Sequence, residues 1–185
     1  TVKLLENHTT NWSDVKAGDE QMAVVKTRIT LDLNGNTVDY LVVGEVVSDE
    51  AGGILESTDG NLTVADNVQG GGYGKIKNLE FVKGSLAIQG GQIGDYNGGN
   101  LTCNGNSGTV TISNGTVYGL TVLEGASVTV NGGSKHAGEW VVASGATLNI
   151  TDGMFGDVQF TRNGTIAISG GTFKSIKSYI AEELQ

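Results

Sequence analysis

One pattern recurs five times along the chain, in LAIQGGQIG (86–94), VTISNGTVYG (110–119), VTVNGGSKHAG (128–138), LNITDGMFG (148–156) and IAISGGTFKS (166–175). Each segment has two apolar residues separated by one position, then polar or small residues, and then a glycine. These glycines, Gly91, Gly115, Gly133, Gly153 and Gly171, stand 24, 18, 20 and 18 residues apart. Each is preceded by glycine, asparagine or aspartate, the residue types that tolerate positive φ. A period near 20 residues that joins short strands to turns predicts stacked coils.

The strands between these turns alternate apolar and polar residues. Val128, Val130, Leu148 and Ile150 occupy equivalent positions in two consecutive coils and are expected to point inward. Hairpins would instead place similar turns at alternate strand ends. The predicted fold is therefore all-β: a single-stranded parallel β-helix with coils of about 18–20 residues, right-handed by the usual chirality of strand connections. A second corner in the later coils is marked by Gly125, Gly145 and Gly164.

The repeat divides the chain into three segments of one domain. Residues 27–175 are expected to form the β-helix, of nine coils at most. Residues 1–26 show no repeat and are predicted to cap the first coil through Leu4, Leu5, Trp12 and Met22. Residues 176–185 are predicted to form a short capping helix, because Ile176, Ile180 and Leu184 fall on one helical face. Residues 41–60 and 96–106 break the period and are predicted to be protruding loops or an irregular coil.

The amino-acid composition favours strands over helices and argues against anionic partners. The 30 glycines among 185 residues are about 16% of the chain, against roughly 7% in ordinary proteins. Glycine-rich sequence is unfavourable for helices, and with no proline in the chain the turns must be built by glycine, asparagine and aspartate. A net charge of −9 argues against nucleic acid and anionic membranes as partners, and no apolar run is long enough to span a bilayer. The single Cys103 excludes an internal disulfide and a multi-cysteine metal site.

Several segments resemble a known family. They are RITLDLNGNTV (28–38), VTISNGTV (110–117), IAISGGTF (166–173) and the ending SIKSYIAEELQ (175–185). Over about residues 27–184 the chain resembles the Gly-rich right-handed β-helix modules of large surface proteins of Gram-positive and gut bacteria. The resemblance implies a β-helix and a cell-surface context, and it carries over no catalytic residues. The 185 residues contain no second copy of the module and no anchor motif, unlike the large proteins of this family, and the module is therefore expected to be solitary. A phage of such bacteria could carry a similar coil module.

Catalytic and metal-binding patterns are sought because β-helices often host polysaccharide lyases and glycosidases. Glycoside hydrolysis needs a pair of carboxylates about 5–9.5 Å apart. Asp95, Asp152 and Asp157 are interpreted as turn-forming residues, and the sequence has no Asp-Asp pair or Gly-His-Gly segment. Arg28 and Arg162 lack a suitable acidic partner in aligned coils, and His8 and His136 lie far apart. No catalytic residue, cofactor or metal ligand is predicted.

Sugar binding is the chemistry that the sequence favours most. Carbohydrate rings stack on exposed aromatic side chains, while polar groups fix their hydroxyls. The candidate ligand-binding residues are Trp140, Tyr118 and Tyr96. The alternative for Trp140 is that it packs within or against the coil stack.

These observations lead to three functional hypotheses. The first is a non-enzymatic, extracellular module of a bacterial cell surface that serves adhesion or glycan recognition, with surface glycans or proteins as partners. The second is a structural protein of a phage virion, a head decoration, fibre or tail appendage with capsid or tail proteins as partners. A homotrimer would favour this second hypothesis. The third is a polysaccharide lyase or glycosidase.

Overall fold

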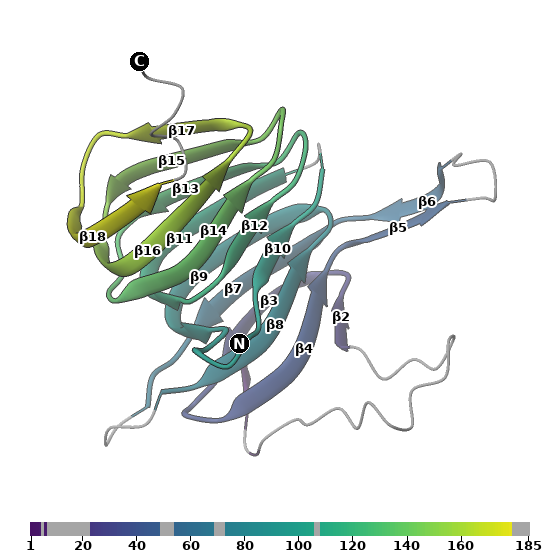
Figure 1. The fold of residues 1–185 in the computed structure, drawn as a ribbon. Coiled ribbons are helices and arrows are strands. Elements are labelled where there is room, and N and C mark those ends of the chain that lie inside the picture. The colour runs from purple at the N-terminus through teal and green to yellow at the C-terminus, as the bar shows by residue number, and fades with distance from the viewer. Residues whose placement is uncertain (5, 7–22, 49–53, 69–72, 106–107, 179–185) are drawn as a thin grey trace.

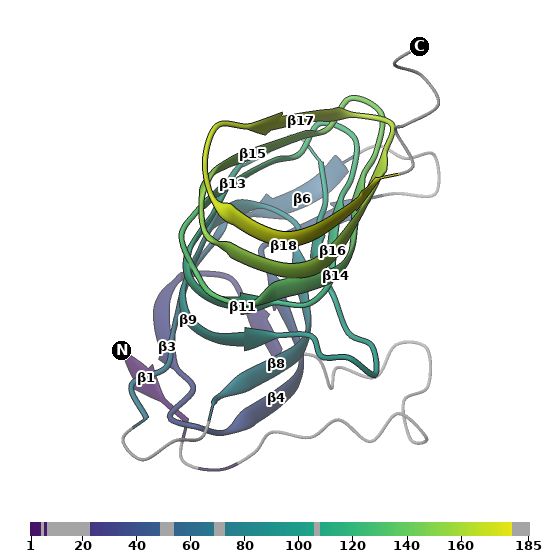
Figure 2. The same cartoon turned by 60° about the vertical axis from the view of Figure 1, so that its left-hand side comes forward.

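The chain forms a β-solenoid of about 7 turns. The computed structural model describes residues 1–4, 6, 23–48, 54–68, 73–105 and 108–178, and all regular elements within these ranges are strands. Figure 1 shows the coils stacked one on another, with β3 and β4 near one end of the stack and β17 and β18 at the other. Figure 2 shows the same stack after rotation, with strands on two opposite sides of each coil. The predicted parallel β-helix is confirmed.

Two parallel ladders of strands run along the stack and contribute one strand each per coil. The first ladder contains β1 (Val2–Lys3), β3 (Arg28–Asp32), β7 (Gly60–Ala65), β9 (Gly84–Ile93), β11 (Gly108–Val117), β13 (Ser127–Asn131), β15 (Thr147–Asp152) and β17 (Thr165–Ile168). The second contains β2 (Ala23–Val25), β4 (Thr37–Val43), β8 (Lys75–Phe81), β10 (Leu101–Cys103), β12 (Leu120–Val122), β14 (His136–Val142), β16 (Met154–Arg162) and β18 (Thr172–Ser178). The long strand β9 turns a corner and pairs with both ladders.

The core consists of inward-facing side chains aligned from coil to coil. In the first ladder, one column runs through Leu62, Leu86, Val110, Val128 and Leu148, and all five side chains are buried. The predicted inward orientation of the alternating residues is confirmed, since Val128, Val130, Leu148 and Ile150 are all buried. Each coil contacts only the adjacent coils, so the stability of the stack is approximately a sum of terms within each coil and between neighbouring coils.

The repeated glycines form one corner of the solenoid. All five have positive φ angles, between 76° and 127°, a conformation that is strained for residues with a Cβ atom. The residues that precede them do not adopt positive φ. Instead, the side-chain oxygens of Asn114 and Asp152 accept hydrogen bonds from the next backbone N–H, at 2.8 and 2.7 Å. The pattern of a polar residue followed by glycine is thus explained by one corner geometry.

A hairpin leaves the stack at the first of the two interruptions of the period. Strands β5 (Glu45–Ser48) and β6 (Ile54–Thr58) pair with each other in antiparallel fashion, form a separate two-stranded sheet and project away from the coils (Figure 1). Leu41–Val43, in contrast, lie in β4 and belong to the stack. In the second interruption, Leu101–Cys103 form the regular strand β10, and the irregular part is the turn before it.

The two ends differ from the sequence-based expectation. The predicted capping helix is wrong at its start, because Ile176 lies in β18 and pairs with Val158 of the coil below. Strand pairing overrides the helical spacing of Ile176, Ile180 and Leu184 there, and residues 179–185 lie outside the described residues. In the predicted N-terminal cap, Val2–Lys3 and Ala23–Val25 already add strands to the two ladders, and Leu4 packs against the core. The other predicted cap residues, Leu5, Trp12 and Met22, also lie outside the described part.

Candidate functional site

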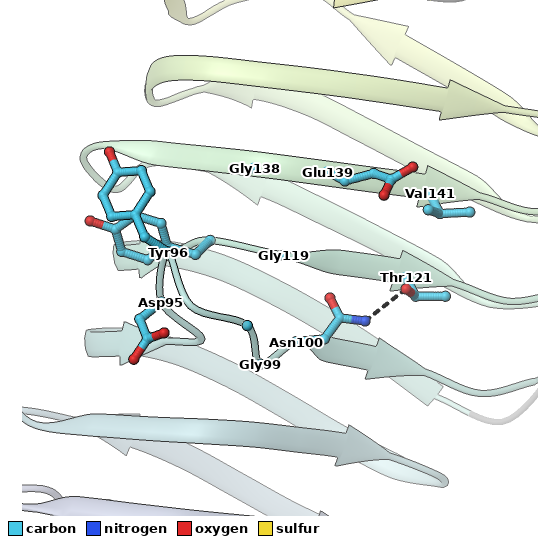
Figure 3. Close-up of a pocket in the computed structure, with 11 residues that line it drawn as sticks. Asp95, Tyr96, Gly99, Asn100, Gly119, Thr121, Gly138, Glu139 and Val141 are labelled. Carbon is cyan, nitrogen blue, oxygen red and sulfur yellow. Dashed lines mark hydrogen bonds between the residues drawn. The ribbon is translucent and has the colours of Figure 1, made fainter.

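A surface cavity of about 320 Å³ lies where the turn after β9 meets the starts of the strands in the second ladder. Its walls come from three successive coils. They are formed by Asp95, Tyr96, Gly98, Gly99, Asn100, Tyr118, Gly119, Thr121, Gly138, Glu139 and Val141 (Figure 3). The cavity therefore exists only when these coils are stacked.

The turn that carries Tyr96 is held by its own backbone and by one ion pair. Asp95 and Gly98 exchange two backbone hydrogen bonds, and one Asp95 carboxylate oxygen accepts the N–H of Asn97 at 2.8 Å. The other oxygen lies 2.7 Å from the ammonium of Lys75 on β8. The Lys75 ammonium, with the Asn97 N–H, holds the pKa of Asp95 below its usual value. Asp95 is thus a stable carboxylate that fixes the turn and presents Tyr96.

Two tyrosines form the aromatic part of the site. Tyr96 is 84% exposed, and its ring centroid lies 4.8 Å from that of Tyr118, with 59° between the ring planes. Burial raises the pKa of the Tyr118 phenol, and the nearby Tyr96 and Asp95 raise it further. The Tyr118 hydroxyl therefore stays protonated at neutral pH. The pair offers an exposed ring next to a hydroxyl that can donate and accept hydrogen bonds.

Glycines make the cavity hollow. A Cβ atom on Gly138 would lie 1.8 Å from the carbonyl oxygen of Tyr118 in the neighbouring coil, and one on Gly99 would lie 2.2 Å from the carbonyl oxygen of Lys77. These close approaches of the backbones require glycine at both positions. Because Gly98, Gly99, Gly119 and Gly138 carry no side chains, the floor between the tyrosines and the polar wall is open.

The opposite wall carries polar side chains from successive coils. The Asn100 amide donates to the hydroxyl of Thr121 at 2.7 Å, an interaction drawn in Figure 3. Glu139 on β14 is exposed, and one of its carboxylate oxygens accepts a hydrogen bond from Thr161 at 2.9 Å. Ring faces, amide, hydroxyl and carboxylate groups thus surround one concave surface, which is the usual composition of a small-ligand site.

The three aromatic residues predicted from the sequence separate into two groups. Tyr96 and Tyr118 are brought together at the cavity. The ligand-binding assignment of Trp140 is wrong, because its side chain is 0% exposed. Its indole N–H donates to the carbonyl of Ala137 at 3.1 Å, and its ring packs edge-on against Phe155 and Phe160. Trp140 lies in the inward column between Leu120 and Phe160, as its alternative interpretation stated.

Two polar residues of the site, Asn100 and Glu139, were not predicted from the sequence, whereas Asp95 was predicted to form a turn and does so. Glu139 and Val141 flank the inward-facing Trp140, so strand alternation alone places both on the outer surface. The polar run DYNGGN (95–100) lies mostly within the second interruption of the period, where loops carry function most often. Strand alternation and the polar run are both visible in the sequence. The sequence does not show that these two segments line one cavity.

A second cavity, of about 240 Å³, lies at the first-coil end of the stack. Its lining is entirely apolar and consists of Val2, Leu4, Ala23, Val24, Val25, Ile29, Leu31, Val38, Leu41 and Leu62. A cavity without polar side chains cannot orient a hydroxylated ligand. The tyrosine cavity is therefore the candidate site.

Asp152, Asp157 and Ser175 have structural roles. The hydroxyl of Ser175 donates to Asp157 at 2.6 Å, while Asp152 caps the N–H of Gly153. In the described ranges, no three histidine, cysteine, aspartate or glutamate side chains come together as a metal site. The same ranges contain no helix of the length and apolarity needed to cross a bilayer.

The fold and the site define a class, the parallel β-solenoids with a concave polar and aromatic site on one ladder. Comparison with known protein families, with characterised proteins and with solved structures found no match for the chain.

Proposed function

We propose that the protein is a non-catalytic carbohydrate-binding module of a bacterial cell surface. The observation that carries the proposal is the exposed ring of Tyr96, paired with Tyr118 at the mouth of the cavity. An exposed aromatic face beside amide, hydroxyl and carboxylate groups suits a sugar ring, which has an apolar face and a polar rim. The cell-surface location is proposed from the resemblance of the coils to bacterial surface modules.

The state of Asp95 argues against its acting as the general acid of a glycosidase. Asp95 and Glu139 both line the cavity. Asp95 has both oxygens engaged, and its pKa is lowered, mainly by the hydrogen bond from Lys75. A glycosidase requires one carboxyl group with a raised pKa to protonate the leaving group. Asp95 does not have this property.

The test is a glycan array followed by calorimetric titration of the best ligand. We expect Tyr96→Ala to weaken binding by about tenfold or more, because stacking on one aromatic ring contributes on the order of 1.5 kcal/mol. Tyr73→Ala is the matched control, since Tyr73 is 77% exposed and does not line the cavity. Equal affinities of the two variants would contradict the proposal.

The mass of the purified protein in solution separates the cell-surface proposal from the virion alternative. Light scattering should give a monomer for a simple surface module. A trimer would instead favour the virion alternative, and capsid or tail proteins would then be the partners to test.

A further inference from the structure

Glu139 gives the candidate site a negative charge that the described part of the protein does not neutralise. Its carboxylate is exposed and accepts a hydrogen bond from the uncharged hydroxyl of Thr161. Asp95, the other acidic residue of the cavity, is paired with Lys75. Among the described residues, Glu139 forms no such ion pair. The cavity therefore presents one carboxylate whose charge is available to a ligand.

The rest of the lining does not reverse this charge. The residues that form the cavity include two carboxylates but no lysine, arginine or histidine. The whole chain also has a net charge of −9, so the long-range field adds to the local one. A glycan with carboxylate or sulfate groups would be repelled from such a site. A cationic sugar would be attracted.

The tyrosines favour the same kind of ligand. The face of an aromatic ring attracts a cation, and the interaction is worth about 0.5–1 kcal/mol at exposed sites. In Figure 3, Tyr96 lies on one side of the cavity and Glu139 on the other, with the glycine floor between them. A ligand in the cavity is thus flanked by a ring face and a carboxylate, two groups that both stabilise an ammonium ion.

We infer that the ligand of this site is an amino sugar with a free, protonated amine, that is, a de-N-acetylated glucosamine-type glycan and not its N-acetylated form. This inference rests on the proposed function. The amine forms an ion pair with Glu139, and the sugar ring stacks on Tyr96. Acetylation converts the ammonium into a neutral amide and removes the charge interaction with both groups.

The experiment compares glucosamine and N-acetylglucosamine oligomers of equal length in calorimetric titrations at mildly acidic pH and low salt. We expect the glucosamine oligomer to bind about tenfold more tightly, and this preference to shrink as salt is added. Glu139→Gln should abolish the preference while retaining an oxygen for Thr161. Glu124→Gln, which neutralises another exposed carboxylate outside the cavity, is the matched control and should retain it.

The outcomes separate this inference from the function on which it rests. Equal binding of both oligomers, with both lost in Tyr96→Ala, would overturn the amine preference and leave the glycan-binding function standing. A preference for the glucosamine oligomer that survives in Glu139→Gln would also overturn the inference, since a group other than the Glu139 carboxylate would then recognise the amine. Binding that is insensitive to Tyr96→Ala would overturn both.

Discussion

At the scale of single residues, strand alternation decides which side chains build the core and which build the site. In β14, Glu139 and Val141 line the cavity, whereas Trp140 between them is fully buried. The same strand begins with His136, which is also buried and packs against the rings of both Trp140 and Phe155. An imidazole in this position must be neutral, because a charge in an apolar core is strongly unfavourable.

The hydrogen bonds of His136 define its protonation. Its Nδ1 accepts the N–H of Val117 at 3.1 Å, so the proton is on Nε2, which donates to the carbonyl of Gly132 at 3.0 Å. Burial lowers the pKa of His136 below its usual 6.5, and the bond to Gly132 offsets part of this. As the pH falls below 6.5, the unfolded chain takes up a proton at this residue before the folded chain does. The free energy of unfolding must therefore decrease.

We predict that the free energy of unfolding decreases as the pH falls from about 7.5 to about 5.5. His136 alone contributes a slope of at most about 1.4 kcal/mol per pH unit. Urea unfolding at a series of pH values measures it. His136→Asn keeps an acceptor for the N–H of Val117 and should remove this part of the slope. The lowered pKa values of Asp32 and Asp95 act in a more acidic range, because they start from 3.8. A variant with an unchanged slope would show that His136 is not the responsible group.

Only some residues of the candidate site could be predicted from the sequence. Tyr96 and Tyr118 could be predicted because they flank an interruption of the repeat. The prediction that Trp140 binds the ligand assumes that its ring is exposed and available for sugar stacking. The alternation around it, with Val142 also buried, places it inside. That Glu139 and Tyr96 face one cavity could not be predicted, because it depends on the pairing of β12 with β14 and on the exact length of the turn after β9.

At the scale of elements, the hairpin β5–β6 is an addition to the coil stack and not a part of it. It pairs with no other strand among the described residues, and Val46, Val47 and Ile54 on it are exposed. Ion pairs of Lys26 with Glu45 and of Lys83 with Asp59 hold its base, and such surface pairs contribute little, about 0–1 kcal/mol each. An isolated hairpin of this kind adds little stability by itself.

We predict that deletion of residues 45–58 leaves the protein folded. The junction is geometrically feasible, because a Cβ atom on Gly60 would lie only 2.3 Å from the backbone nitrogen of Gly44. The deletion joins Gly44 directly to Asp59, and the thermal midpoint should fall by no more than a few degrees, since little apolar surface is lost. Circular dichroism melts of the two proteins measure the change. Removal of residues 120–139, which takes out β12, β13 and the first part of β14, is the contrasting control and should be strongly destabilising.

Strands and turns that belong to the repeat are predicted well from the sequence, whereas segments at the interruptions and ends of the repeat are not. The five glycines predicted the corner because a positive φ strongly favours glycine, and all five adopt one. The sequence predicts a helix at Ile176 because three apolar residues at a spacing of four match a helical face. In the structure, the free edge of β16 offers Ile176 a strand partner at Val158, and tertiary pairing overrides local periodicity.

At the scale of the whole molecule, the solenoid has a buried apolar interior that becomes more exposed at its last coil. The inward column of the first ladder passes from Ile112 through Val130 and Ile150 to Ile168. The first three are 0% exposed, whereas Ile168 is 46% exposed. No described strand pairs with the outer edge of β17. A residue's contribution to stability must therefore depend on its coil, even where its identity and its position within the coil are the same.

The pair Ile150 and Ile168 tests this directly, since the two residues are neighbours in one column and occupy equivalent positions in their coils. Ile150→Ala should lower the free energy of unfolding by about 2–5 kcal/mol, because it removes buried methyl groups and leaves a cavity between two coils. Ile168→Ala should cost less than about 1 kcal/mol, because much of its side chain is already in water. Urea unfolding of both variants gives the comparison. Equal losses would mean that further structure covers the last coil in solution. Unequal losses in the expected order would mean that the stack is stabilised by neighbouring coils and is weakest at this end.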